Sequence, residues 1–397
     1  MLTYEEALKH VLETVNPLVP KTHPLLEAAG LVLAESVSAQ WDMPRCDNSA
    51  MDGFAIVDHP NEVKGSLEIV GTSYAGHPFT GTMTSGQAIR ITTGAPLPGG
   101  ANTVIPIEDA MDQKTQVSLS APALPGQHIR HQGEEFKTGA LLLEPGTHLH
   151  AGEIGLLACA GIEQVFVYPK PRVAIISSGD ELVELGQTPG SGQIINSNLY
   201  LLMTRVRECG CLPIALGIGR DNPEALDNLI GEGMSADLII STGGVSVGDK
   251  DQVHNALARR SFQQKFWKVA MKPGKPVLFG TLGDKPYFGL PGNPAATAAT
   301  FELFVKPALR RLFGEKDITP NKRTGALTSE VKGGGKRQLF LWCRLEWAGR
   351  EYQVTVPKMQ GSGQHVSIQG ANALLSIPIG TEELRTGEIV EVILLDA

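Results

Sequence analysis

The fold is decided by Asp237-Leu-Ile-Ile-Ser-Thr-Gly-Gly-Val-Ser-Val-Gly-Asp-Lys-Asp251, in which an apolar strand runs directly into a glycine-rich loop with aspartates at its end. The strand, Asp237–Ser241, is a continuous apolar run of the kind that is buried on both faces of a sheet. The glycines let backbone N–H groups come close to a bound anion. The segment therefore predicts a ligand-binding loop at the end of a buried strand.

The same order of strand, loop and helix repeats on both sides of this segment, over residues 169–315. Alternating strands and helices predict a parallel sheet that is covered by helices on both faces. The helices are expected over Asn196–Cys209, from Asn222-Pro223, and from Asn293-Pro294 toward Val305. Pro307 should kink or restart the last of these helices. The other strands are expected at Arg172–Ser177, Leu212–Gly217, Lys265–Ala270 and Tyr287–Leu290.

Polar residues follow these strands where each one ends. The loops are Ser177–Glu181, Gly219–Asp221, Thr242–Asp251 and Pro291–Pro294. Ligands of open α/β sheets bind at the carboxyl ends of the strands, and carboxylates there can hold Mg²⁺. The set favours a site for Mg²⁺ and a nucleotide or pyrophosphate, whereas any single loop is equally well explained by tight turns and helix caps. A P-loop is rejected, because Asp249 stands where the essential lysine would be.

Lys268, Lys272 and Lys275 lie close together in the sequence. Pro273, Gly274 and Pro276 hold the last two in a rigid turn, and lysine binds oxyanions as a point charge. The alternative is a solvated surface turn.

The rest of the chain has a different pattern. Short strand-like runs, such as Phe54–Val57 and Ala88–Thr92, alternate with glycine and proline turns. They predict an inserted β domain over residues 44–136 and a β-barrel over 316–397. Segments 1–43 and 137–168 are expected to form a discontinuous linking domain, with helices over residues 3–15 and 25–39. The predicted class is multidomain α/β plus β.

Composition excludes several functions. The net charge of −8 gives no support for binding to nucleic acid or to a membrane surface. The chain has five cysteines, an odd number, and their spacing is not that of a zinc site. The start of the chain lacks a signal-peptide pattern, so we expect a cytoplasmic protein with reduced thiols. The sequence contains neither the HExxH pattern of zinc proteases nor the GxSxG elbow of serine hydrolases.

Several strings, taken in order, resemble the molybdopterin molybdenumtransferase (MoeA) family, which is similar to the C-terminal domain of gephyrin. They span nearly the whole chain: Asn48-Ser-Ala-Met-Asp-Gly, Thr93-Gly-Ala-Pro, Gly133-Glu-Glu, Ser178-Gly-Asp-Glu-Leu182, Ile195-Asn-Ser-Asn198, Gly243-Gly-Val-Ser-Val-Gly-Asp249, Lys272-Pro-Gly-Lys-Pro276 and Leu290-Pro-Gly-Asn-Pro294.

The resemblance implies that the α/β domain is akin to molybdopterin adenylyltransferase. It also implies an elongated homodimer with each active site between subunits, and molybdoenzyme acceptors and the adenylyltransferase as partners. The implied reaction converts adenylylated molybdopterin and molybdate into molybdenum cofactor and AMP with Mg²⁺. Carried over by position, the catalytic residues are Asp52, Thr93, Glu181, Asp221, Asp251, Lys268, Lys272 and Lys275, of which Glu181, Asp221 and Asp251 hold the metal. The binding residues are Gly243, Gly244, Ser246, Gly248, Asn293, Ser362 and Arg344.

The chain departs from the family pattern where molybdate is expected to bind. Trp342 replaces a usual arginine, Ala296 replaces a common serine, and Val366 replaces one serine of a pair. Arg344 lies two residues after Trp342, on the same strand face, and is the candidate substitute. Two competing functions are considered: an adenylyltransferase, whose Gly-Gly-Thr-Gly differs from Gly243-Gly-Val-Ser246, and a scaffold, as gephyrin clusters receptors.

Overall fold

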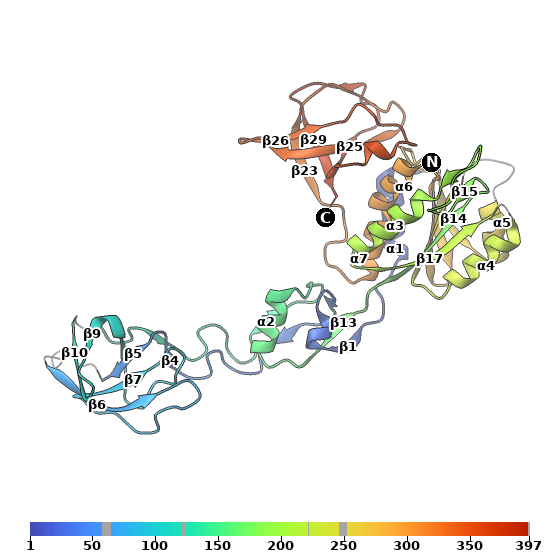
Figure 1. Cartoon of the computed structure of the whole chain (residues 1–397). Coiled ribbons are helices and arrows are strands. Elements are labelled where there is room, and N and C mark those ends of the chain that lie inside the picture. Colours follow the sequence, from blue (N-terminus) through green and yellow to red (C-terminus); the bar gives the residue numbers. More distant parts are fainter. Residues whose placement is uncertain (58–64, 121–123, 221, 246–251, 396–397) are drawn as a thin grey trace.

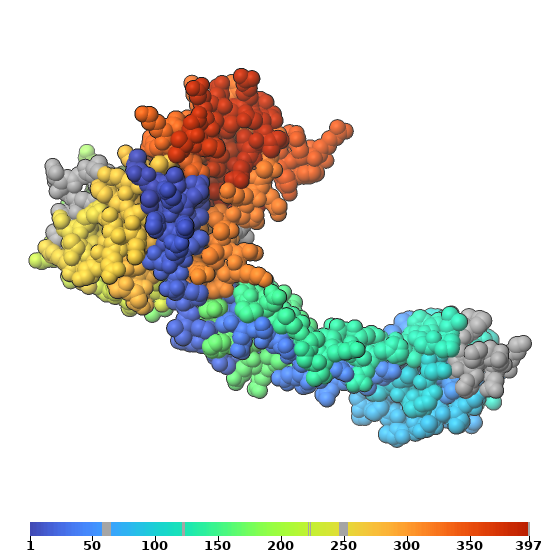
Figure 2. Space-filling view, turned by 180° about the vertical axis from the view of Figure 1, so that it is seen from behind, coloured from blue at the N-terminus to red at the C-terminus, as the bar shows by residue number. Residues whose placement is uncertain are grey.

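The computed structural model describes residues 1–57, 65–120, 124–220, 222–245 and 252–395. The molecule is elongated (Figure 1), with the α/β domain and the C-terminal barrel at one end. The inserted β domain lies at the other end of an extended arm (Figure 2), and the small linking domain lies between them. No helix of the described ranges has the length and apolar composition needed to cross a membrane.

The α/β domain is built on a six-stranded sheet of order β17-β14-β18-β22-β21-β19. Its first four strands are parallel, as predicted, and buried apolar clusters cover both faces. The strands are β14 (Arg172–Ser178), β17 (Leu212–Gly219), β18 (Leu238–Thr242), β19 (Gln263–Trp267), β21 (Leu278–Leu282) and β22 (Lys285–Leu290), with the small pair β15 (Leu182–Val183) and β16 (Ile194–Ile195) beside them. The helices are α3 (Ser197–Glu208), α4 (Pro223–Gly233), α5 (Gln252–Arg259), α6 (Pro294–Thr300) and α7 (Lys306–Leu312).

The prediction of a wholly parallel sheet is wrong at one edge. The expected strand 265–270 runs from Gln263 to Trp267 instead, and it pairs antiparallel with β21, which was not predicted. Only Gly283 and Asp284 separate β21 from β22, and Gly283 has φ +59°. A connection of two residues can only join antiparallel strands, because a parallel pair needs a long crossover.

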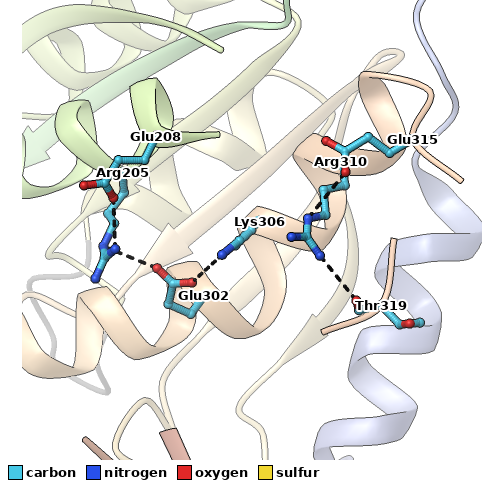
Figure 3. Close-up of polar contacts among 7 residues, drawn as sticks. All are labelled: Arg205, Glu208, Glu302, Lys306, Arg310, Glu315 and Thr319. Carbon is cyan, nitrogen blue, oxygen red and sulfur yellow. Dashed lines mark hydrogen bonds and ion pairs between the residues drawn. The ribbon is translucent and has the colours of Figure 1, made fainter. Parts of the chain in front are cut away.

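The helix predicted to begin at Asn293 continues as α6, a π-helical turn (Phe301–Val305) and α7, so the expected interruption near Pro307 is present. Glu302 lies on this turn, is only 4% exposed, and joins two cations (Figure 3). Its carboxylate lies 3.3 Å from the Arg205 guanidinium and 3.3 Å from the Lys306 ammonium. The buried charges are therefore paired with each other between α3 and α7.

Replacing Glu302 with glutamine should lower the free energy of unfolding by about 2 kcal/mol, because Arg205 and Lys306 would then face a neutral amide. Denaturant titration measures the loss. Glu208→Gln is the matched control, since Glu208 is another partner of Arg205 (2.9 Å) but is far more exposed, and less than about 1 kcal/mol is expected there. Equal losses in the two variants would contradict the role of burial.

The linking domain is a small sheet of β1 (Lys21–Pro24), β13 (Gln164–Tyr168) and β2 (Val32–Leu33), with α2 (Ala151–Cys159), a 3₁₀ turn (Leu25–Ala28), and the pair β3 (Val37–Ser38) and β12 (Leu141–Leu143). The predicted helix over 25–39 is wrong. Gly30 takes φ +76°, which ends the helical turn, and the Leu33 N–H donates to the carbonyl of Thr147 far along the chain. Non-local pairing therefore overrides the helical spacing of the apolar residues.

The predicted first helix is confirmed as α1 (Tyr4–Thr14), including the capping box between Thr3 and Glu6. Its buried face packs into the α/β domain. Tyr4, Ala7 and Val11 lie in the largest apolar cluster of the α/β domain, together with residues of α7. The amino-terminal helix thus belongs physically to the α/β core.

The inserted domain is a six-stranded sheet of order β8-β5-β7-β6-β10-β9 with one apolar cluster on each face. Its strands are β5 (Gly53–Ile56), β6 (Ser66–Ser73), β7 (Gln87–Ile91), β8 (Thr103–Pro106), β9 (Ala110–Asp112) and β10 (Gln116–Leu119), with a 3₁₀ turn (Ile107–Asp109) and the small pair β4 (Asn48–Ser49) and β11 (Ile129–Arg130).

The C-terminal domain is the predicted barrel, closed because β25 pairs with both β26 and β27. Its strands are β23 (Lys322–Leu327), β25 (Gln338–Trp347), β26 (Tyr352–Thr355), β27 (Ala373–Ile377) and β29 (Ile389–Leu394), with the pair β24 (Val331–Lys332) and β28 (Glu383–Leu384) and a 3₁₀ turn (His365–Ser367). A strand from the α/β domain, β20 (Met271–Lys272), extends this sheet along β25. The lysine turn therefore lies where the two domains join.

Candidate active site

A cavity of about 860 Å³ opens at the carboxyl ends of the parallel strands, as the loops predicted. Parallel strands end at one edge of the sheet, so loops far apart in the sequence meet there. The walls come from the ends of β14, β18 and β22, from the start of α3, and from a loop of the barrel. The lining includes Ser178, Gly179, Glu181, Asn196, Ser197, Asn198, Thr242, Gly243, Gly244, Pro291, Gly292, Asn293, Gly363 and His365.

The glycine-rich loop begins in a conformation that excludes side chains. Gly243 and Gly244 have φ of +85° and +64°, and a Cβ at Gly243 would lie 2.4 Å from the Ser178 carbonyl oxygen. The two backbones are thus packed directly against each other at the cavity wall. Of the predicted binding and metal residues, Ser246, Gly248, Asp251 and Asp221 lie outside the described residues, whereas Glu181 is described and lines the cavity.

Two asparagines that the sequence interpretation did not select also form the wall. The amide nitrogen of Asn198 donates to the Thr242 hydroxyl (3.2 Å) and to the Gly292 carbonyl (2.7 Å), which ties α3 to two loops. Asn196 is buried beside it. Both belong to the string Ile195-Asn-Ser-Asn198, and that string was the only signal that could have found them.

A barrel loop covers one side of the cavity and is attached to the α/β domain by three hydrogen bonds. The Asn293 amide donates to the Ser362 hydroxyl (3.0 Å), and the Ala295 N–H donates to the Ser362 carbonyl (2.9 Å). The Ser197 hydroxyl and the His365 imidazole are 2.9 Å apart. Asn293 precedes α6 as predicted, but its side chain makes no cap bond to the helix, so Asn293 and Ser362 serve to join the two domains at the site.

The predicted lysines lie on one turn but in different surroundings. The Lys268 ammonium lies over the Trp267 ring, 3.7 Å from its centroid, and the Trp267 indole N–H donates to the carbonyl of Val245 in the glycine-rich loop. Lys272 and Lys275 are exposed. The turn is fixed by a hydrogen bond from the Val269 N–H to the Lys275 carbonyl (3.0 Å), and the next residue, Pro276, lines the cavity.

Asp52 and Thr93 lie together, but far from this cavity. The Thr93 N–H and hydroxyl both donate to one Asp52 carboxylate oxygen, at 2.6 and 2.9 Å. These bonds, the backbone one first, hold the pKa of Asp52 below its usual value. Asp52 precedes β5 and Thr93 follows β7, so the pair lies in the inserted domain, at the opposite end of the molecule from β14 (Figure 1). One chain alone therefore does not bring all the predicted catalytic residues together.

A Thr93→Val variant should raise the pKa of Asp52 toward its ordinary value, because the hydroxyl bond to the carboxylate is lost while the backbone bond remains. NMR titration of the aspartate carboxyl measures the change. Thr138→Val is the matched control: Thr138 holds the Asp42 carboxylate in the same way, so it should shift Asp42 and not Asp52. A lower pKa for Asp52 in Thr93→Val would contradict this account.

Arg344 and Trp342 differ in their surroundings although they share a strand face. Trp342 is buried in the cluster between the barrel and the α/β domain, and its backbone N–H and carbonyl are both bonded to the Gln360 side chain. Arg344 is exposed and donates from Nε to the Gly370 carbonyl (2.8 Å). Like the three lysines, Arg344 is not among the described residues that line the cavity, and in this structure its guanidinium holds a barrel loop.

Known protein families and relatives match this chain over nearly its whole length. Residues 2–161 match the family model described as "MoeA N-terminal region (domain I and II)", residues 174–311 match "Probable molybdopterin binding domain", and residues 324–395 match "MoeA C-terminal region (domain IV)". A protein of Nostoc sp. named molybdopterin molybdenumtransferase is 39% identical over 382 residues, which cover 94% of this chain and 88% of that protein. One of the same name from Staphylococcus epidermidis is 32% identical and covers 100% of this chain and 96% of its own length. The crystal structure of the molybdopterin biosynthesis MoeA protein of Pyrococcus horikoshii superposes with a TM-score of 0.84 at 30% identity, covering 100% of both chains.

Proposed function

The chain belongs to the MoeA family, and from that premise we propose that it is a molybdopterin molybdenumtransferase, which inserts molybdate into adenylylated molybdopterin and releases AMP. The observation that carries the proposal is the cavity at the carboxyl ends of the α/β sheet, in which a glycine-rich loop, a carboxylate and a barrel loop face one space. Such an edge of a parallel sheet is where nucleotides and phosphates bind.

The residues of the cavity wall, and of the lysine turn that reaches it at Pro276, divide into groups with different tasks. The backbone at Gly243 and Gly244 can approach a pyrophosphate because it carries no side chain. Lys268, Lys272 and Lys275 supply positive charge for molybdate and phosphate oxygens from one side. The Asn293–Ser362 and Ser197–His365 bonds hold the barrel loop over the substrate. Positioning and charge compensation are the main requirements for breaking a phosphoanhydride bond.

We extend the proposal to Mg²⁺ as the resident metal. Glu181 lines the cavity, and carboxylate oxygens are the ligands that Mg²⁺ prefers, so this donor fits the ion. The described residues hold no group of three metal-ligating side chains, so the proposal depends on Asp221 and Asp251 as well. Glu181, with Asp221 and Asp251, would hold the ion. When bound, Mg²⁺ offsets the negative charge that develops on the pyrophosphate.

Removal of divalent metal should lower AMP release at least about tenfold, because the phosphate charge would lose its main counter-ion. The release is measured in EDTA and again after Mg²⁺ is added back, which should restore it. Treatment with an EDTA–Mg²⁺ mixture of the same ionic strength is the control. Undiminished AMP release in EDTA would remove magnesium from the proposal.

The proposal also includes a homodimer in which Asp52 and Thr93 of one chain complete the site of the other. The support is their position on the extended arm, remote from the cavity of their own chain (Figure 1). A two-fold arrangement would place each arm at the partner's cavity. We expect such a dimer in the cytoplasm, where it would receive substrate from an adenylyltransferase and pass cofactor to molybdoenzymes.

The direct test mixes the protein with adenylylated molybdopterin and molybdate, without ATP, and measures AMP. A molybdenumtransferase should release AMP only when molybdate is present. An adenylyltransferase would instead consume ATP and release pyrophosphate, and a scaffold would do neither. Either of the last two results would overturn the proposal.

A further inference from the structure

One buried side chain on the cavity wall has polar groups without partners. Asn196 is 1% exposed, yet neither its amide nitrogen nor its amide oxygen has a hydrogen-bond partner within the described ranges. A buried polar group left unpaired costs about 1–3 kcal/mol, so native structures rarely keep one without a use. The residue lines the cavity.

The usual structural reason for an asparagine at this position does not apply. Asn196 is the N-cap of α3, where asparagine is favoured because its side chain can accept from the first turn. Here the side chain makes no cap bond, whereas Asn222, the N-cap of α4, does accept from the Glu224 N–H (2.9 Å). The start of α3 therefore does not account for the buried amide.

A second lining residue, Asn198, also has a polar atom that is unpaired among the described residues. The amide oxygen of Asn198 has no partner within the described ranges, although its nitrogen is bonded to Thr242 and Gly292 and fixes the side chain. The Ser177 hydroxyl, fully buried at the carboxyl end of β14, is also unpaired within that part of the chain, although Ser177 itself is not among the lining residues. A fixed wall of unpaired donors and acceptors is the arrangement expected for a site whose hydrogen bonds are completed by a ligand.

We infer that the Asn196 amide pairs with the edge of a substrate heterocycle on which a donor and an acceptor stand side by side. An amide offers N–H donors next to a carbonyl acceptor, so it matches such an edge with two parallel hydrogen bonds. The inference rests on the proposed function, because adenylylated molybdopterin carries two heterocycles with this chemistry, the pyrimidinone of the pterin and the adenine. Asn196 thereby acts as a specificity-determining residue of the cavity.

The test replaces Asn196 with leucine, which has similar size and no polar atoms. Binding of adenylylated molybdopterin, measured by calorimetry without molybdate, should weaken at least about tenfold, since two hydrogen bonds are lost. The melting temperature of the free protein should not fall, because the substitution removes groups that are already unpaired. Asn196→Ala, which adds no bulk, should give the same loss of affinity. A parallel titration with AMP identifies the heterocycle: an equal loss of AMP affinity assigns the adenine edge, and unchanged AMP affinity assigns the pterin edge.

Asn198→Leu is the matched control, since it removes the bonds to Thr242 and Gly292 and should lower the melting temperature. The inference is overturned if both Asn196 variants bind adenylylated molybdopterin within about twofold of wild type. A change of that size is smaller than the loss of one hydrogen bond would cause. It is also overturned if both melt as low as Asn198→Leu, which would make the amide structural. Failure of the proposed function is separate: it would show as wild-type protein that releases no AMP.

Discussion

Mixing Asp52→Ala chains with Lys272→Ala chains should restore about a quarter of the wild-type AMP release, although each variant alone is expected to be inactive. Asp52 lies on the extended arm and Lys272 lies at the junction of the α/β domain and the barrel, so one chain does not bring them together. If each site takes its arm from one chain and its cavity from the other, a mixed dimer has one intact site and one doubly damaged site. Random exchange makes about half of the dimers mixed, which gives the expected quarter.

The control for this experiment pairs Asp52→Ala with Thr93→Ala. Both lesions lie in the inserted domain, next to each other, so every site of a mixed dimer would still contain one damaged arm. No recovery is expected from that mixture. If Asp52→Ala and Lys272→Ala also give no recovery after subunit exchange has been verified by mass, the sites are built within single chains.

Lys272→Ala alone should lower kcat/KM for molybdate insertion by about 10²–10³-fold, the loss typical of removing one preorganised donor to a developing anion. Lys272 is suited to this role because its backbone is held in β20, paired with Leu339 of the barrel. Met271 beside it is fully buried, so the alternation of the strand leaves Lys272 outward, where it is exposed. No carboxylate of the described part of the chain forms an ion pair with its ammonium.

The loss at Lys272 is measured from AMP release at low molybdate, where weaker binding cannot be hidden by saturation. Lys265→Ala is the control: Lys265 is an exposed lysine of the edge strand β19, and its removal should leave kcat/KM nearly unchanged. Wild-type turnover in Lys272→Ala at low molybdate would assign the lysine to the solvated surface instead.

The cavity could be predicted from the sequence because parallel strands have a simple geometry. Buried strands such as β14 and β18 read as continuous apolar runs, and their carboxyl ends must meet at one edge, so Glu181 and Gly243 were expected in one place. The short strands of the inserted domain were equally readable, since β5 and β10 each lie between turn residues. A local sequence pattern therefore predicts an element correctly when tertiary contacts agree with the conformation that the pattern favours.

The remaining features depend on contacts between distant parts of the chain. The segment 25–39 has apolar residues at helical spacing, but Leu33 pairs with Thr147, and only the folded structure shows that partner. Arg344 stays the candidate substitute for a missing arginine, but only the folded structure shows that its guanidinium donates to the Gly370 carbonyl. Asn196 could not be singled out, because an unpaired amide is recognised from burial and from the absence of a partner among the described residues. The sequence pattern alone shows neither the burial of a side chain nor its hydrogen-bond partners.

The strand β20 has a consequence for the modularity of the chain. The barrel and the α/β domain share β20 and one apolar cluster, which includes Phe340 and Trp342, so we expect them to unfold together. The inserted domain has its own clusters on both faces of its sheet and is therefore autonomous. An enzyme made of one such composite body and one self-sufficient module can tolerate changes in the module, or even its exchange, without unfolding the catalytic body, whereas the barrel cannot be removed without exposing the core of its neighbour.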